Sequence, residues 1–507
     1  MFDTQLMLQG LQGIITPLSV VLMVVGVFCG AVFGAIPGLT GGIAIAILLP
    51  LTFKLEAIPA MALLIGVYVG GAYGGSIPSI LFGTPGAPEA SVTSFDGYPM
   101  MKKGLGGKAL KTALYSSAAG NFLAAIITIT MMVGVSKLAL MMDAPDYFGI
   151  VVFSIVLIAT IGCKESWIKG LIAVLLGLMF GFIGGDPITG MLRFTFGNRF
   201  LMSGLSLIPV LIGLFVGAEV LAEAGILHKR NSTTIAEFKE NNRITGSDVK
   251  KCVPAVLSGT VIGSIIGALP GLNAAISATL NYSFIKKVSK NSESFGEGNI
   301  VGVAAAEAAN NATAGPTLVP LLTLGIPGSG TAAIFLGALT IQGIVPGPTI
   351  FRDAGDVVYG IFFALLLCTI ILAVVGRGLI SGAQLISFIP TEVLNPIIIL
   401  TCCAGAFSVS NRLSDVFILL FFMVIGYFMR VLKIPTLPLL ISFLLGGMME
   451  SNFRRSLLMS DGSLSALFNA KFCGFFLVLS FAMILFTIFA PVVKKLIATK
   501  KSKVKEN

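Results

Sequence analysis

Long apolar runs with few polar interruptions dominate the pattern of the chain. Clear examples are the stretches 109–135, 357–375 and 472–492. Each is close to or above the roughly 20 residues that an α-helix needs to cross a bilayer. Strands of a membrane barrel would be short and would alternate in polarity, so these runs predict helices. The pattern therefore predicts an all-α polytopic membrane protein.

Composition agrees with this prediction. The chain has 507 residues, of which 56% are hydrophobic and only 11% are charged. Soluble globular proteins carry about 25% charged residues, so this chain cannot cover a water-exposed surface. Its seven cysteines are scattered and show no spacing typical of a metal site or a disulfide framework. We interpret them as small apolar side chains inside helices.

A ladder of glycines four residues apart occurs twice in the chain. It consists of Gly26, Gly30, Gly34 and Gly38 with Pro37, and again of Gly259, Gly263, Gly267 and Gly271 with Pro270. The copies are offset by 233 residues (267 minus 34), and a second pair of landmarks, 83–86 and 325–328, follows at an offset of 242 (325 minus 83). Two landmarks in the same order indicate an internal duplication.

Basic residues indicate which loops face the cytoplasm. They gather in the loops 96–108 and 225–251 and in the C-terminal tail, whereas the first 16 residues contain only Asp3 as a charged side chain. Because basic loops stay on the cytoplasmic side, we expect Lys102 and Lys250 inside and Arg352 outside. Counting spans from these anchors places the N-terminus in the periplasm and the C-terminus in the cytoplasm. The two copies then cross an inner membrane in opposite directions, as in many secondary transporters.

The expected architecture is two inverted-topology repeats with re-entrant hairpins and broken helices, with roughly 11–12 transmembrane helices in all. We divide the chain into repeat one (1–108), intervening transmembrane helices (109–224), a basic cytoplasmic loop (225–251), repeat two (252–350), C-terminal transmembrane helices (351–493) and a basic cytoplasmic tail (494–507).

Each repeat contains two Pro-Gly interruptions of its apolar segments. Proline removes a backbone donor and glycine permits unwound backbone, which survives at membrane depth only beside protein or a water-filled cavity. The breaks are either a binding site or kinks that serve helix packing. We expect a substrate-binding site because they recur in corresponding places. Its residues are Pro37, Gly38, Leu39, Thr40, Gly83, Thr84, Pro85, Gly86, Pro270, Gly271, Leu272, Asn273, Pro327, Gly328 and Ser329.

Helix N-termini at these breaks would favour an anion, since each offers free N–H groups and about half a positive charge. Polar residues in otherwise apolar surroundings, among them Ser76, support a site. Glu307, Asn310 and Asn311 are spaced so that one helical face presents all three. With Thr313, they form an expected cation-coupling site for Na⁺ or H⁺, with Na⁺ near Asn310, Asn311 and Ser329. The alternative is polar contact between helices.

Several long motifs are similar to those of a known family. They are GAIPGLTGG (34–42), LLPLTF (48–53), YVGGAYGGSIPSIL (68–81), TPGAPEASVTSFDGYPMMKKG (84–104), FGEGNIVGVAAAEAANNATAG (295–315) and VPLLTLGIPGSGTAAIFLGALTIQGIVPGP (319–348). The chain resembles the large membrane subunit of the tripartite tricarboxylate transporter family, the TctA type. It departs from the family's usual residues at Gly83, Val301 and Ala306.

This resemblance implies a three-part importer. A periplasmic solute-binding protein would capture a citrate-like tricarboxylate or related organic anion, and a small membrane subunit would accompany this chain. Uptake would be driven by cation symport without a cofactor, and the chain indeed lacks a Walker A pattern, since Ala109 follows Gly107-Lys108. A membrane-embedded enzyme is a poorer alternative, because neither HExxH nor GxSxG occurs. A stand-alone anion channel or carrier is a better one, although rings of charged residues are missing.

Overall fold

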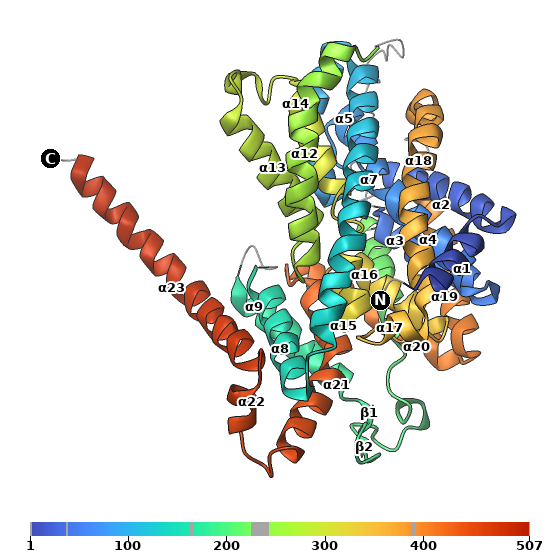
Figure 1. The fold of residues 1–507 in the computed structure, drawn as a ribbon, viewed down its shortest axis with the longest axis vertical. Helices are drawn as coiled ribbons and strands as arrows, with labels where there is room; N and C mark the ends of the chain where they lie inside the picture. Colours follow the sequence, from blue (N-terminus) through green and yellow to red (C-terminus); the bar gives the residue numbers. More distant parts are fainter. Residues whose placement is uncertain (1–2, 37–38, 162–165, 225–242, 387–390, 506–507) are drawn as a thin grey trace. The chain divides into compact units, whose positions relative to one another are not determined.

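The computed structural model describes residues 3–36, 39–161, 166–224, 243–386 and 391–505 (Figure 1). The described chain is almost entirely helical, as the apolar runs predict. It divides into two compact units. Unit 1 comprises residues 1–140 and 206–427, and unit 2 comprises residues 141–205 and 428–507.

Unit 1 contains both copies of the glycine ladder. Its helices are α1 (Thr4–Ile14), α2 (Pro17–Ala35), α3 (Gly41–Leu48), α4 (Ala57–Gly74), α5 (Ser76–Phe82), α6 (Ser94–Lys102), α7 (Gly106–Ala139), α10 (Leu207–Leu211), α11 (Ala218–Ala224), α12 (Gly246–Ala268), α13 (Ala274–Val288), α14 (Ile300–Asn311), α15 (Leu318–Leu324), α16 (Gly330–Ile341), α17 (Ile350–Asp353), α18 (Gly355–Ile386), α19 (Thr391–Ser410) and most of α20 (Leu413–Val431). Short 3₁₀ segments are η1 (Leu49–Lys54), η2 (Pro88–Ser91) and η5 (Ser292–Ser294), and η4 (Ile212–Gly217) is a π-helix.

Unit 2 is a smaller group of helices with a short antiparallel ribbon. Its elements are α8 (Ala144–Ile161), α9 (Trp167–Gly181), β1 (Gly184–Gly185), β2 (Leu192–Arg193), η3 (Arg199–Leu201), α21 (Thr436–Leu458), α22 (Ser465–Asn469) and α23 (Cys473–Lys505). Charged side chains fix the loop after α9, because Arg454 contacts Asp186 at 2.7 Å and Arg193 contacts Glu450 at 2.9 Å. Desolvation favours a higher pKa for Asp186, but hydrogen bonds from the Ile188 N–H and from Arg454 hold that pKa below its usual value.

Six described helices are long and apolar enough to cross a membrane. They are Pro17–Ala35, Ala57–Phe82, Gly106–Ala139, Gly246–Ala268, Gly355–Gly382 and Leu413–Val431. Seven shorter apolar helices accompany them: Gly41–Lys54, Ala144–Thr160, Trp167–Gly181, Leu207–Ala222, Gly330–Ile341, Asn395–Ser408 and Cys473–Phe489. The fold is that of a multi-pass, all-α membrane protein; the number of crossings and their inverted directions stay predictions.

The first glycine ladder is the contact face of α2 against α4. A Cβ atom built on Gly26 or Gly30 would lie 2.3 Å from Leu63 O or 2.2 Å from Val67 O. Large apolar side chains of α2, among them Val21 and Phe28, point away from this contact and are exposed. A helix that packs between protein and lipid needs small residues on the face toward the protein and apolar side chains on the face toward the lipid, and α2 has both.

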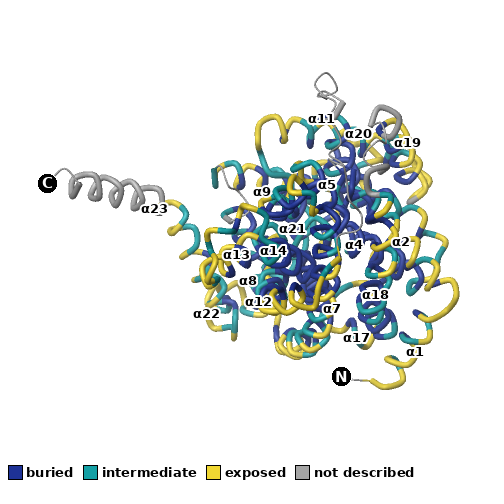
Figure 2. Tube along the Cα trace, turned by 90° about the horizontal axis from the view of Figure 1, so that it is seen from above, coloured by how far each residue is buried: buried dark blue, intermediate teal, exposed yellow. Residues whose placement is uncertain are grey.

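The second ladder packs in the same way against α14 and the residues that follow it. Cβ atoms on Gly263 and Gly267 would lie 2.7 Å from the Ala312 side chain and from Thr313 O. The outer face of α12 exposes Val253, Leu257 and Val261 at a spacing of four residues. The pairs α2–α4 and α12–α14 are therefore built alike. As Figure 2 shows, the central helices α4, α5 and α14 are among the most buried parts of unit 1.

Helices α5 and α15 also correspond. Each has 7 residues with a proline at its third position, and each ends at a left-handed glycine. These glycines are Gly83 (φ 69°) and Gly325 (φ 71°). A residue with a side chain would be strained there, so the glycine of the second landmark has the same backbone role in both copies. We call residues 1–108 the first half of unit 1 and residues 252–350 its second half.

Candidate functional site

In each half, the second break lies beside the first break or beside the helix that leads into it. In the second half, the Gly271 N–H donates a hydrogen bond to the Gly328 carbonyl at 2.9 Å. In the first half, Gly86 contacts Gly34 of the glycine ladder. A Cβ added to Gly86 would lie 2.4 Å from Gly34 O. Pro37 and Gly38 lie outside the described residues. In both halves, the second break is therefore folded back onto the segment that leads into the first break.

A helix with a side-chain cap begins directly after three of the breaks. Thr40 caps α3, Asn273 caps α13 and Ser329 caps α16, each by accepting a hydrogen bond from the N–H three residues on. A cap satisfies only part of the first turn, so further N–H groups and the positive end of the helix dipole remain at each start. The structure thus supplies the helix N-termini that the sequence analysis expects.

The helices that begin at these starts contact segments of the other half. Helix α3 of the first half packs against α16 of the second, and a Cβ on Gly42 would lie 3.0 Å from the Thr331 hydroxyl. Helix α13 of the second half packs against η2, which follows the second break of the first half. The segment after the first break in each half therefore contacts the segment after the second break in the other half. These contacts bring the described segments that follow the breaks together in two pairs inside unit 1.

Exposure varies among the expected substrate-binding residues. Buried are Leu39, Gly86, Gly271, Pro327 and Gly328; partly buried are Thr40, Gly83, Pro270, Leu272 and Ser329; exposed are Thr84, Pro85 and Asn273. Gly86 and Gly328 differ most in their surroundings. Gly86 is packed against backbone, whereas a Cβ on Gly328 would meet nothing closer than 3.6 Å. Of these two glycines, only Gly328 has room for a side chain.

A buried carboxylate lies nearby, in α14. Glu307 is fully buried, and one of its oxygens accepts hydrogen bonds from Ser76 Oγ, at 2.5 Å, and from Thr93 Oγ1. Its other oxygen accepts from Ser117 Oγ at 2.8 Å. These hydroxyls come from α5, from the residue before α6 and from α7. Glu307 therefore joins the second half to the first half and to the helix that follows it.

Asn310 and Asn311 lie on the next turn of α14. Asn311 Nδ2 donates to Ser117 Oγ at 2.9 Å, and Asn310 Nδ2 donates to Ala72 O at 3.3 Å. The Oδ1 atoms of both side chains are buried without a hydrogen-bond partner. Thr313 is occupied locally, since its hydroxyl donates to Asn310 O at 2.7 Å. Of the expected cation-coupling residues, Glu307 and Asn311 are linked by their hydrogen bonds to Ser117. Thr313 instead uses its hydroxyl for a hydrogen bond to a backbone carbonyl.

Thr93 and Ser117 are contacts of Glu307 that the sequence analysis does not identify. No local pattern distinguishes them, because Ser117 lies in the long apolar helix α7 and meets α14 only in the folded chain. The ion pairs of the described chain do not include Glu307. No group of three or more His, Cys, Asp or Glu side chains that could hold a metal occurs among the described residues.

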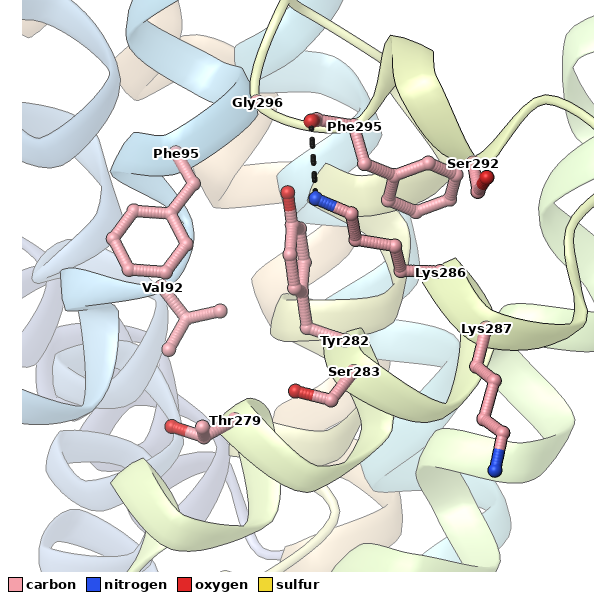
Figure 3. A pocket seen from close by; sticks show the side chains of 10 residues that line it. All are labelled: Val92, Phe95, Thr279, Tyr282, Ser283, Lys286, Lys287, Ser292, Phe295 and Gly296. Carbon is pink, nitrogen blue, oxygen red and sulfur yellow. Dashed lines mark hydrogen bonds between the residues drawn. The ribbon is translucent and has the colours of Figure 1, made fainter. Parts of the chain in front are cut away.

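A pocket of about 770 Å³ borders α13 (Figure 3). Its lining residues are Val92, Phe95, Thr279, Tyr282, Ser283, Lys286, Lys287, Ser292, Phe295 and Gly296. Lys286 crosses it toward the Phe295 carbonyl, 3.5 Å away. The Tyr282 hydroxyl donates a hydrogen bond to Asp96 Oδ2, at 2.8 Å, and Asp96 does not line the pocket. Two lysines in the last turn of α13 therefore share this pocket with Val92 and Phe95, which follow η2.

Comparison with known proteins gives the family. The family model described as "Tripartite tricarboxylate transporter TctA family" matches residues 20–441. A protein of Agrobacterium vitis, "Uncharacterized 52.8 kDa protein in TAR-I ttuC' 3'region", is 32% identical over 454 residues, covering 89% of this chain and 90% of that protein. A second one, "Uncharacterized protein in TAR-II ttuC' 3'region", is 34% identical over 200 residues, covering 39% and 83%. No solved structure gives a significant match. The chain therefore belongs to a family of transporters rather than of enzymes, the tripartite tricarboxylate transporter TctA family.

Proposed function

We propose that this chain is the large membrane subunit of an importer for organic anions of the di- or tricarboxylate class. The observation that carries the proposal is the exchange of contacts between the halves, in which α3 meets α16 and α13 meets η2. Capped helix starts at Thr40, Asn273 and Ser329 direct N–H groups toward this region. Such groups bind carboxylates without a buried lysine or arginine, which would be costly at membrane depth.

The positive charge of the pocket in Figure 3 supports an anion path. Lys286 and Lys287 stand at the end of α13, 13 and 14 residues after Asn273 (286 and 287 minus 273). Exposed lysines attract a carboxylate at long range without holding it tightly. We therefore place this pocket on the route between the breaks and the cytoplasm.

Energetics require a second ion. Each elementary charge moved across 100 mV costs about 2.3 kcal/mol, so a multivalent anion needs cations to enter a negative cell interior. We propose cation symport, with a periplasmic solute-binding protein and a small membrane subunit as partners, in the inner membrane. The N-terminus would be periplasmic and the C-terminus cytoplasmic. A stand-alone anion channel is the alternative; it would conduct without the binding protein and without saturation.

Gly328 offers the sharpest test of the site. Gly328→Ala is expected to reduce uptake at least about tenfold, because the new methyl group fills space beside the Gly271–Gly328 contact without displacing protein atoms. Uptake of a labelled carboxylate would be measured in vesicles that contain the full three-part system. Gly347→Ala is the matched control, since a Cβ there meets nothing within 4 Å. Normal uptake by Gly328→Ala would remove this break from the site.

Gly86→Val is unsuitable for the same test. Its Cβ would lie 2.4 Å from Gly34 O and 2.9 Å from the Pro78 ring, so the variant would disturb folding before it could report on substrate. The two glycines hold corresponding places in the sequence, but the structure gives only Gly328 the freedom that a diagnostic substitution needs.

A further inference from the structure

Among the ion pairs of the described residues, none gives Glu307 a partner of opposite charge to offset its burial. Moving a carboxylate out of water costs several kcal/mol unless an opposite charge or a full set of hydrogen bonds compensates. Three hydroxyl groups surround Glu307, but a hydroxyl carries no net charge. The described titratable side chains that interact electrostatically with Glu307 include Glu89 and Tyr73, and neither is cationic. These three hydrogen bonds alone would have to compensate a charged Glu307 unless a cation from solution binds beside it.

The buried amide oxygens are an independent observation. Asn310 Oδ1 and Asn311 Oδ1 have no hydrogen-bond partner, although both side chains are almost fully buried. Buried polar atoms are nearly always satisfied, so such an atom needs an explanation, and a bound ion is one. The spacing of three and four residues from Glu307 puts both amides on the carboxylate's face of α14. A protonated Glu307 would not require these oxygens, whereas a metal cation would use that of Asn311, whose amide also contacts Ser117.

We propose that Glu307, Ser76, Thr93, Ser117 and Asn311 form a binding site for a sodium ion; the inference rests on the cation symport proposed above. Carboxylate, hydroxyl and amide oxygens are hard ligands that suit such a cation. A single carboxylate balances one positive charge, which favours a monovalent ion over Ca²⁺ or Mg²⁺. The ligands come from α14, α5, α7 and the residue before α6, so the ion would hold the two halves of unit 1 together.

Sodium binding is testable on the purified full chain without partners or substrate. Thermal unfolding in detergent would be followed with a thiol dye that reacts with the buried cysteines Cys252 and Cys368 as they become exposed. NaCl would replace choline chloride at constant ionic strength. At tenfold excess over the dissociation constant we expect the melting temperature to rise by about 2 °C or more, with saturation. KCl and choline chloride are expected to have no such effect.

Two serines of α5 provide a matched pair of variants. Ser76 donates to Glu307, whereas the equally buried Ser79 donates to the Gly75 carbonyl of its own segment. Ser76→Ala is expected to raise the half-saturating Na⁺ concentration about tenfold. Ser79→Ala is expected to leave it unchanged. Glu307→Gln should abolish the response; if that variant does not fold, the serine pair and direct binding of radioactive sodium still decide.

Three outcomes are distinct. A melting temperature that does not change with Na⁺ overturns the sodium site. Equal half-saturating Na⁺ concentrations for Ser76→Ala and Ser79→Ala also overturn it. A response to pH without a response to Na⁺ also overturns it and identifies the proton as the ion. If Na⁺ does not bind while vesicles still take up carboxylate, the sodium site is wrong and the proposed function stands. If Na⁺ binds but no carboxylate is taken up, the proposed function is wrong and the sodium site stands.

Discussion

Asp96→Ala is expected to destabilise unit 1 by at least about 3 kcal/mol. Asp96 Oδ1 accepts hydrogen bonds from the N–H groups of Gly296, Gly298 and Asn299, at 2.9, 2.9 and 2.7 Å. Hydrogen bonds to a charged group are worth about 1.5–3 kcal/mol each, and water can replace only part of them here. Because these residues precede α14, losing Asp96 releases the start of the helix that carries Glu307. Melting temperature in detergent measures the effect.

The control for Asp96 is another aspartate, Asp353. It is exposed and pairs with Arg352, its neighbour in sequence. Surface pairs contribute little, so Asp353→Ala should barely change the melting temperature. Asp96→Asn keeps an acceptor oxygen but loses the charge, and it should fall between wild type and Asp96→Ala. Equal melting temperatures for Asp96→Ala and Asp353→Ala would show that the contacts of Asp96 do not stabilise unit 1.

Gly30→Val is expected to prevent stable packing of α2 on α4. Its Cβ would lie 2.2 Å from Val67 O and 2.8 Å from Val67 Cα, and backbone cannot move aside as a flexible side chain can. Overpacking usually costs 1–3 kcal/mol, and we expect about 3 kcal/mol or more because the clash is with backbone. The yield of monodisperse protein after detergent extraction measures it.

Gly134→Ala is the matched control for the ladder. Gly134 also lies in a long helix, α7, but an added Cβ meets nothing within 4 Å. The change should be neutral or slightly stabilising, since alanine favours helix over glycine by about 0.5–1 kcal/mol. Similar yields for Gly30→Val and Gly134→Ala would contradict the packing described for α2 and α4.

The local features of the fold were predictable from sequence because they depend on neighbouring residues. Apolar length predicts the long helices, and the glycines at a spacing of four predict a close helix contact. Thr40, Asn273 and Ser329 follow directly after breaks and are residue types that cap helices. The structure confirms the all-α membrane fold.

The surroundings of Glu307 were not predictable, since they depend on residues far apart in sequence. Ser76, Thr93 and Ser117 are 231, 214 and 190 residues away from it. A serine or threonine in an apolar helix usually bonds to its own backbone, as Thr128 does to Ala124 O. The contact of Asp96 with the residues before α14 likewise spans 200 or more positions. Sequence patterns identify such residues as polar but do not predict which residues they contact in the folded chain.

Protection of introduced cysteines by substrate tests most directly that both halves form one anion site. Thr40→Cys in the first half and Thr331→Cys in the second would be made in a chain without other cysteines. A carboxylate known to be taken up, at tenfold excess over its dissociation constant, should slow maleimide modification at both positions about tenfold. Modification of the exposed Thr349→Cys should not change. Protection in only one half, or in neither while uptake proceeds, would contradict a shared site.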